Sequence, residues 1–313
     1  MTTPAPQRPP YATQNGKVVP FEEAKVSIMA PGLTFAAAVF EGLRAYWNEE
    51  TEQLSVFRAP EHLERLNFSM SMIELDNPPS AEEFTAQMVE LLRACAYRED
   101  TYIRIQAYVD DWGDMLATGP VGSSIICRQR ARVPAFEEGR HFGVSSWRRN
   151  ADDASPPRIK ATANYLNSRL AGLEAKRSGY GGAIILNRDG SLSEGPGGCI
   201  FIRRGDSLVT PPVSAGILES VTRYTMIDLA REAGIEVIER DIGRTELHLA
   251  AEAFYCGTGQ EMVPILSVDG KSMGDGAGAG APGKVTRQLQ KRYDDVIRGR
   301  DERYAHWLTP VYG

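Results

Sequence analysis

The stretch PRIKATANYLNS, residues 157–168, places Lys160 five positions before Tyr165. The four residues after the lysine, 161–164, are small or short, so a bulky planar ligand could approach the amine closely. A lysine in such a setting can act as a covalent catalyst, because its amine adds to aldehydes. We therefore take an aldehyde cofactor as the leading hypothesis. The alternative is one more solvated lysine among 35 Lys and Arg residues.

The composition is that of an ordinary globular protein. A chain of 313 residues exceeds the size at which single cores stop growing, which predicts two packed units. The formal charge of -6 provides no general basic field, so nucleic acid is not an expected partner. The start of the chain lacks the apolar core of a secretory signal, and no apolar run is long enough to span a bilayer. These features predict a cytoplasmic protein without a membrane partner.

The cysteines and histidines give no ligand pattern. Four cysteines are widely spaced without a CxxC pair, and we expect all four to be reduced thiols. Four histidines are equally scattered, so no metal site is predicted.

The first part of the chain reads as a small α+β domain over residues 1–130. We expect the amphipathic helix 59–75 to bury Leu63, Leu66, Met70 and Ile73, and a second helix over 80–97 to begin with a capping box of Ser80 and Glu83. The expected strands are short ones within 17–29, a hairpin over 40–58, and strands at 101–110 and 123–130.

A polar, proline-interrupted stretch at 131–140 predicts the interdomain linker, followed by a larger mixed α/β domain over 141–313. We expect helices from the Lys160 segment to Arg177, over 222–234 with Gly234 at its end, and over 245–250. The expected strands are 142–147, 182–189, 199–205, 235–242 and 251–257.

A glycine-rich stretch near the end contains Gly278, Gly283 and Lys284 at the spacing of a phosphate-binding P-loop. The residue after the lysine is Val285, where a P-loop needs a hydroxyl to hold magnesium. We favour a glycine-rich loop before the last helix, and keep a nucleotide-binding regulatory protein as the alternative.

Six motifs occur in order along the chain: FEGLRAY from Phe40, EHLERL to Leu66, KATANYLNS from Lys160, SEGPGGCIF from Ser193, ILESVTR from Ile217 and CGTGQEMVP from Cys256. This series resembles the fold-type IV pyridoxal-phosphate enzymes, the class IV aminotransferases, and among them most closely the branched-chain amino acid aminotransferases. The resemblance implies two α/β domains as in D-amino acid aminotransferases, with the cofactor in the interdomain cleft, and a homodimer or higher homo-oligomer.

The resemblance also implies roles around pyridoxal 5′-phosphate. Lys160 matches the catalytic lysine that forms the Schiff base and moves the proton. Tyr165 matches the tyrosine at the phenolic oxygen, and Glu194 the carboxylate beside the ring nitrogen, which must stay protonated if the ring is to accept electrons. The other matches are Arg65 as a bidentate phosphate charge, Val221 and Thr222 as a helix-terminal phosphate cup, Thr258 as a further donor, and Leu218 against the ring face.

For the substrate, Tyr102 and Arg104 lie two apart on an expected strand and resemble a YxR pair near the substrate carboxylate. Arg44 points toward the same pocket in the family, and Phe35, Phe40 and Gly259 also fall at substrate positions. Trp112 could line the apolar pocket or belong to the core.

Three positions depart from the family pattern: Phe35 replaces a tyrosine, Cys199 an asparagine, and Gly259-Gln260 two alanines. A thiol is a weaker donor than an amide, so the departures bear on substrate range. We expect a ping-pong aminotransferase that moves the amino group of branched-chain or aliphatic L-amino acids to 2-oxoglutarate. An R-selective amine or D-amino acid transaminase, or a lyase like aminodeoxychorismate lyase, stays open on the same lysine.

Overall fold

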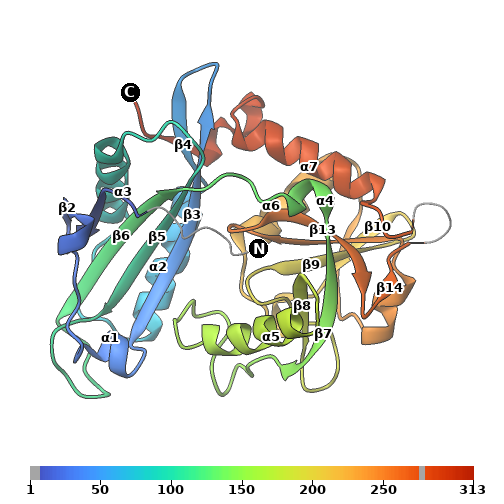
Figure 1. Cartoon of the computed structure of the whole chain (residues 1–313), viewed down its shortest axis with the longest axis horizontal. Coiled ribbons are helices and arrows are strands. Elements are labelled where there is room, and N and C mark those ends of the chain that lie inside the picture. The colour runs from blue at the N-terminus through green and yellow to red at the C-terminus, as the bar shows by residue number, and fades with distance from the viewer. Residues whose placement is uncertain (1–7, 275–278) are drawn as a thin grey trace. The chain divides into compact units, whose positions relative to one another are not determined.

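The computed structural model describes residues 8–274 and 279–313. Contacts within the chain divide it into two units. Figure 1 colours the chain by residue number, from blue at the N-terminus to red at the C-terminus. The first unit comprises residues up to 131 together with 159–163 and 296–313, and the second comprises 132–158 and 164–295. The sequence predicts that the chain passes from one domain to the other only once, in the linker at 131–140. The difference arises because 159–163 and the C-terminal strand form hydrogen bonds to strands of the first unit.

The first unit is built on a seven-stranded sheet in which every neighbouring pair is antiparallel. The order is β15-β4-β3-β5-β6-β1-β2. The strands are β1 (Tyr11–Gln14), β2 (Lys17–Pro20), β3 (Ala38–Asn48), β4 (Gln53–Phe57), β5 (Thr101–Val109), β6 (Val121–Gln129) and β15 (Leu308–Pro310). The helices are η1 (Phe21–Glu23), α1 (Pro31–Thr34), α2 (Ala59–Met72), α3 (Ala81–Cys95) and η5 (Glu302–Trp307).

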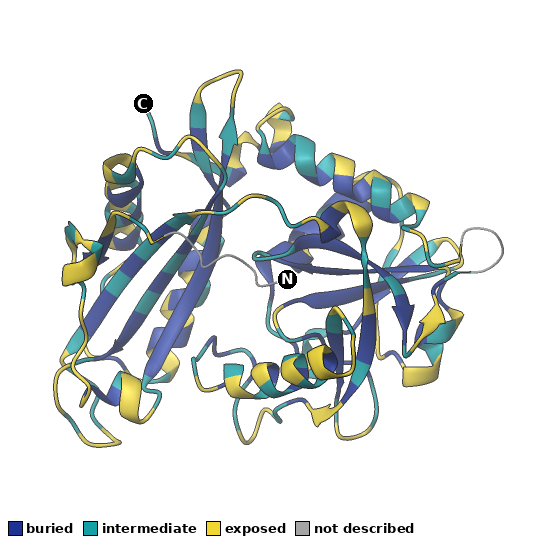
Figure 2. Ribbon diagram, viewed as in Figure 1, coloured by how far each residue is buried: buried dark blue, intermediate teal, exposed yellow. Residues whose placement is uncertain are grey.

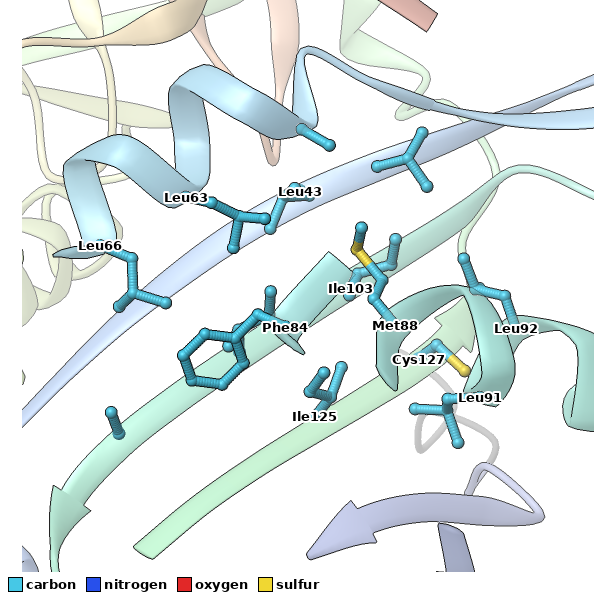
Figure 3. Close-up of a cluster of buried hydrophobic side chains, with 14 of the residues drawn as sticks. Leu43, Leu63, Leu66, Phe84, Met88, Leu91, Leu92, Ile103, Ile125 and Cys127 are labelled. Atoms are coloured by element: carbon cyan, nitrogen blue, oxygen red, sulfur yellow. The ribbon is translucent and has the colours of Figure 1, made fainter. Parts of the chain in front are cut away.

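The core of the first unit lies between this sheet and the helices α2 and α3 (Figure 3). Leu63 and Leu66 of α2 and Phe84 of α3 are buried there against Ile103 and Ile125 of the strands. The capping box of Ser80 and Glu83 is present as predicted, and it sets the start of α3. One detail of the prediction is wrong: α2 ends at Met72, so the expected stripe residue Ile73 falls just beyond it.

The N-terminal strands also differ from the prediction. Within 17–29 only β2 is extended, followed by η1, and no strand covers 24–29. Strand β1 at 11–14 pairs with both β2 and β6, although no strand is expected there. The apolar pattern of β1 is too short to indicate a strand, and its partner β6 lies far away in the sequence.

The second unit contains an eight-stranded mixed sheet, ordered β11-β10-β9-β12-β13-β7-β8, with β14 paired to β13. The strands are β7 (Arg140–Arg148), β8 (Gly182–Leu186), β9 (Cys199–Arg204), β10 (Ser207–Thr210), β11 (Val237–Glu239), β12 (Glu252–Gly257), β13 (Glu261–Val268) and β14 (Lys271–Ser272). The helices are α4 (Ala135–Glu138), α5 (Tyr165–Arg177), η2 (Val213–Ala215), α6 (Val221–Glu232), η3 (Arg244–Leu249) and α7 (Lys284–Ile297), whose last two residues are grouped with the first unit. The predicted mixed α/β class is confirmed.

Local chemistry explains the helix that matters most for the site. Helix α6 begins after Ser220, whose hydroxyl accepts a hydrogen bond from the amide of Arg223. It ends before Gly234, which has a positive φ of 75° as expected for a C-terminal glycine. The strand predicted after it, 235–242, is real but shorter, because only Val237–Glu239 pairs with β10.

Burial is concentrated in the two sheets, whose strands are largely dark blue in Figure 2. Among the described residues no helix is long and apolar enough to cross a membrane.

Candidate active site

The backbone around Lys160 is fixed within the first unit. Its amide donates to the hydroxyl of Ser69 on α2 at 3.1 Å, and its carbonyl accepts from the amide of Phe40 on β3 at 3.1 Å. The next residue, Ala161, forms an isolated bridge with Val39. Lys160 is 9% exposed, and its Nζ lies 5.0 Å from the centre of the Phe40 ring. It is therefore a held, buried amine and not a solvated surface charge.

A buried cluster of three polar residues joins β3 to α2 near this lysine. The Glu41 carboxylate accepts hydrogen bonds from Nε and Nη2 of Arg65 at 2.7 and 2.8 Å, and contacts Nδ1 of His62 at 2.8 Å. Burial alone raises the pKa of Glu41, but the charge of Arg65 and the hydrogen bonds from His62 and Arg65 outweigh it and hold that pKa well below its usual range. Glu41 is therefore ionised.

His62 is kept neutral by the same cluster. Its burial lowers its pKa below the ordinary value, the carboxylate of Glu41 opposes this, and the charges of Arg65 and Lys160 lower it further. The neutral ring donates from Nδ1 to Glu41. Glu41 and His62 were not singled out in the sequence. The one available signal is that both lie within motifs that also contain expected site residues, FEGLRAY and EHLERL.

The expectation for Arg65 changes in one respect. A bidentate contact to phosphate was expected, but the Nε–Nη2 edge of the guanidinium is already used by Glu41. An oxyanion would have to be bound through the other edge, Nη1–Nη2, which can also make a bidentate contact.

The strands β3 and β5 present the expected substrate residues on one face. Arg104 pairs with Gly42 and Tyr102 with Arg44, and the burial of β5 alternates, so Tyr102 and Arg104 share the face opposite Ile103. The guanidinium of Arg104 lies 4.1 Å from the centre of the Phe40 ring. Its buried Nε has no hydrogen-bond partner among the described residues.

Arg44, which pairs with Tyr102 across the sheet, is held by contacts within the first unit. It is fully buried, donates to the carbonyl of Arg130 at 2.5 Å and lies 4.0 Å from the carboxylate of Asp100. These contacts favour a structural role within the first unit. Phe35 and Trp112 are on the surface of that unit, 51% and 76% exposed, so neither belongs to its core.

In the second unit the central group is Glu194, which is buried after strand β8. Its Oε1 forms an ion pair with Nη2 of Arg149 at 2.5 Å and also contacts the amide of Leu218 at 3.4 Å. Its Oε2 lies 3.6 Å from Sγ of Cys199. Arg149 was not predicted from the sequence, because it lies 45 positions before Glu194, directly after the end of β7, and belongs to no recognisable motif.

The thiol and phenol groups near Glu194 are uncharged at neutral pH. Burial, with the charge of Glu194, raises the pKa of Cys199 well above its usual value. Burial raises the pKa of Cys256 to about 12, and burial likewise raises the pKa of Tyr255 well above its ordinary value. Tyr165, the first residue of α5, is half-buried.

The start of α6 and the turn between β12 and β13 converge. The hydroxyls of Thr222 and Thr258 lie 3.3 Å apart, although the two residues come from different elements. The turn is closed by a hydrogen bond from the amide of Gln260 to the carbonyl of Gly257 at 3.0 Å. Hydroxyls beside the N-terminus of a helix of this length form a site for a phosphate or another anion.

Glycines allow the backbone around Gly198 to approach closely the end of β12, next to this turn. A Cβ atom on Gly198 would lie 2.3 Å from the carbonyl oxygen of Cys256, and one on Gly257 would lie 2.6 Å from that of Gly197. Neither position accommodates a larger residue. Gln260, one of the departures from the family pattern, accepts a hydrogen bond from Nη1 of Arg140 at 3.0 Å.

The described part of the glycine-rich stretch, from residue 279 onward, carries no phosphate-binding geometry of a P-loop. Gly278 lies outside the described residues. At the start of α7 the carboxylate of Glu252 accepts from the amide and hydroxyl of Thr286, both at 2.8 Å. A Cβ on Gly283 would lie 2.1 Å from that carboxylate. An internal anion thus occupies the place where a P-loop would hold phosphate. Among the described residues no cluster of His, Cys, Asp or Glu could hold a metal ion.

The donor set fits pyridoxal 5′-phosphate. The first unit provides a buried amine for its aldehyde, and the second unit provides a buried carboxylate for its ring nitrogen and a hydroxyl-lined helix N-terminus for its phosphate.

Comparison with known proteins agrees with this chemistry. The profile of the family described as Amino-transferase class IV matches residues 38–268. A probable branched-chain-amino-acid aminotransferase of Aquifex aeolicus is 42% identical over 305 residues, which cover 96% of this chain and 97% of that protein. The crystal structure of the Thermobaculum terrenum branched-chain amino acid aminotransferase in its PLP form has a TM-score of 0.90 and 42% identity, and covers 98% of this chain and 99% of that one. A further branched-chain amino acid aminotransferase, complexed with N-(5′-phosphopyridoxyl)-L-glutamate, has a TM-score of 0.91 at 30% identity, over 98% and 100% of the two chains.

Proposed function

Because this chain belongs to the class IV aminotransferases, we propose that it transfers the amino group of branched-chain and other aliphatic L-amino acids to 2-oxoglutarate in a ping-pong cycle. The cofactor is pyridoxal 5′-phosphate. The similarity to branched-chain aminotransferases covers nearly the whole chain and includes a relative bound to a glutamate derivative of the cofactor, which supports both substrates. The buried amine of Lys160 beside Phe40 is the structural observation that carries the proposal.

When bound, the cofactor supplies an aldehyde for the amine and a ring that accepts electrons. We assign to Lys160 the bond to that aldehyde and the transfer of the substrate proton. Glu194 would accept a hydrogen bond from the protonated ring nitrogen, Tyr165 would donate to the phenolic oxygen, and Leu218 would pack against the ring. The phosphate would be held by Arg65, by the amides of Val221 and Thr222 at the start of α6, and by the hydroxyls of Thr222 and Thr258.

For the substrate we assign the carboxylate to Arg104 with Tyr102. The unpartnered Nε of Arg104 and the apolar ring of Phe40 beneath its guanidinium support this choice, since both prepare the cation to receive an anion. Phe40, Phe35 and Gly259 are proposed to contact the side chain or backbone of the substrate. Arg44 is left out because it is engaged inside the first unit.

The assignment of Lys160 is tested by absorbance. Purified protein is expected to show the visible band of the lysine-bound cofactor, and Lys160→Ala should lose both that band and turnover. Lys176→Ala, at the exposed end of α5, is the matched control and should keep both. An unchanged band in Lys160→Ala would overturn the assignment.

The reaction is tested with a panel of donors. Isoleucine with 2-oxoglutarate should turn over at least tenfold better than D-alanine or R-phenylethylamine. A preference for either of the last two would favour the D-amino acid or R-amine transaminase. Product formed from an amino acid with no 2-oxo acid present would favour a lyase.

We also propose that the protein works as a homodimer in the cytoplasm, and that two surface loops of the first unit form its interface. The exposed apolar side chains of this surface are Ile28, Leu33, Phe35, Trp112, Met115 and Leu116. The two loops adjoin, because a Cβ on Gly113 would lie 3.1 Å from the ring of Pro31. Six large exposed apolar residues on two adjoining segments are typical of a covered surface. Sedimentation should give a dimer for the natural chain and a monomer for Leu116→Asp, and a monomeric natural chain would contradict the proposal.

A further inference from the structure

Arg149 is a buried cation whose backbone and side chain are both fixed in the second unit. Its amide donates to the carbonyl of Leu186 at 3.0 Å, and its Nε donates to the carbonyl of Gly216 at 2.9 Å. Its Nη2 forms the ion pair with Oε1 of Glu194 at 2.5 Å. The side chains of Arg149 and Glu194 are only 5% and 6% exposed. The guanidinium therefore has little freedom to leave the carboxylate.

Arg149 is a cation in direct contact with Glu194, whereas other nearby groups are neutral or paired elsewhere. Cys199, Cys256 and Tyr255 are all buried close enough to interact electrostatically with Glu194, and all three are uncharged at neutral pH. A second cation, the fully buried Arg223, interacts with the same thiols but forms its ion pair with Glu239 at 2.7 Å. A buried carboxylate stays ionised only when such a partner compensates it.

Because Cys199 offers Glu194 only a weak hydrogen-bond donor, the ionised form of Glu194 depends more strongly on Arg149. The contact from its Sγ to Oε2 of Glu194 is 3.6 Å, and a thiol is a weak donor. The amide of Leu218 is 3.4 Å away, at the long end of a hydrogen bond. Compared with these two contacts, the ion pair of Glu194 with Arg149 is both shorter and charged.

We propose that Arg149 is a positioning residue that keeps Glu194 ionised and oriented, so that the proton shared between Glu194 and the cofactor stays on the ring nitrogen. The inference rests on the proposed function. Moving that proton from the ring to Glu194 would bring positive charge closer to the guanidinium, which costs free energy in a buried site. Arg149 thereby opposes the transfer, and the ring remains able to accept electrons.

The experiment follows the ring nitrogen directly. Holoenzyme is reconstituted with cofactor labelled with ¹⁵N in its ring, and the ¹⁵N chemical shift is recorded for the natural chain, Arg149→Met and Arg149→Lys. In Arg149→Met the shift should move from the protonated toward the unprotonated value, and kcat should fall at least about tenfold, which corresponds to about 1.4 kcal/mol. Arg149→Lys keeps a cation, so its ¹⁵N chemical shift and its kcat should both lie between those of the natural chain and those of Arg149→Met. An unchanged shift with kcat within twofold of the natural chain would overturn the proposal.

A second pair of variants keeps the test decisive if Arg149→Met does not fold. Glu194→Gln removes the carboxylate charge, so Arg149→Met can be added without leaving an unpaired buried anion. If Arg149 acts through Glu194, the double variant Glu194→Gln with Arg149→Met should have the same ¹⁵N chemical shift and the same kcat as Glu194→Gln alone. A further loss of tenfold or more in kcat in that background would show that Arg149 acts by another route. Failure of the natural chain to form the visible cofactor band would instead overturn the proposed function, so the two failures are distinguishable.

Discussion

Arg65 forms a bidentate ion pair with the fully buried Glu41, at 2.7 and 2.8 Å, and so joins helix α2 to strand β3 of the first unit. Ser69, one turn further along α2, accepts the amide hydrogen of Lys160. The arginine expected to bind phosphate therefore lies on the same helix that contacts the lysine proposed to bind the cofactor. Arg65 is oriented before any ligand arrives, which lowers the entropic cost of binding.

The stability of this pair is the first prediction. Glu41→Gln removes the negative charge and leaves Arg65 uncompensated in a buried site, so it should cost about 3–5 kcal/mol in the free energy of unfolding. Urea titration of the folded protein measures this loss. Glu50→Gln, in the exposed turn between β3 and β4, is the matched control and should change the free energy by less than about 0.5 kcal/mol. A loss below about 1 kcal/mol for Glu41→Gln would show that the pair contributes little.

A second prediction concerns pH. The folded state lowers the pKa of His62 below 6.5, so the unfolded chain binds more protons as the pH falls through that value. Stability contributed by neutral His62 is therefore complete above about pH 6.5 and declines below it, by at most about 1.4 kcal/mol per pH unit for one proton. His62→Gln keeps an amide donor for Glu41 and should flatten the profile between pH 7.5 and 5.5. Parallel profiles for the two proteins, measured by urea unfolding, would argue against a neutral His62.

Binding of the cofactor phosphate gives a third prediction. Thr222→Val and Thr258→Val each remove a hydroxyl at the N-terminus of α6, and a hydrogen bond to a charged group is worth about 1.5–3 kcal/mol. Each variant should weaken the affinity for pyridoxal 5′-phosphate by roughly 10- to 100-fold, and the affinity for pyridoxal, which lacks the phosphate, by much less. Absorbance titration of the apoenzyme gives both constants. The exposed Thr245→Val should change neither, and equal losses for the two ligands would place these hydroxyls elsewhere on the cofactor.

The substrate carboxylate gives a fourth prediction. Arg104→Met keeps an apolar stem over Phe40 but removes the cation, so kcat/KM for isoleucine should fall roughly 10- to 100-fold. Cofactor affinity should stay within about threefold, because Arg104 is not assigned to the phosphate. Arg98→Met is the control, because it removes an exposed arginine of the same unit. Steady-state rates of the two variants distinguish the loss of the Arg104 cation from the loss of any arginine on this unit. Retained kcat/KM in Arg104→Met would remove it from the pocket.

Sequence patterns predicted the local parts of this structure well. The capping box of Ser80 and Glu83, the end of α6 before Gly234 and the alternation that puts Tyr102 with Arg104 each depend on residues within a few positions of one another. The expected cofactor residues came from ordered motifs, each of which is short and contiguous.

What the sequence could not predict depends on distant pairing. Arg149 and Glu194 are brought together by the order of strands in the second sheet, and Glu41 and Arg65 by the packing of α2 on β3. No periodicity or motif spacing carries such information. Strand β1 was missed for the same reason, because four residues acquire their extended form from pairing with β6.

The start of α7 provides the last prediction. The carboxylate of Glu252 there satisfies the buried amide and hydroxyl of Thr286, so Glu252→Ala should cost about 1–3 kcal/mol in stability by leaving both donors unpaired. Because an internal anion fills this position, the natural chain should not bind ATP with magnesium in calorimetric titration, whatever the resemblance of the preceding glycines to a P-loop. Lys284→Ala serves as the control, since a P-loop would lose its nucleotide with that change. Binding of ATP to the natural chain that disappears in Lys284→Ala would contradict the assignment and restore a nucleotide site at this helix.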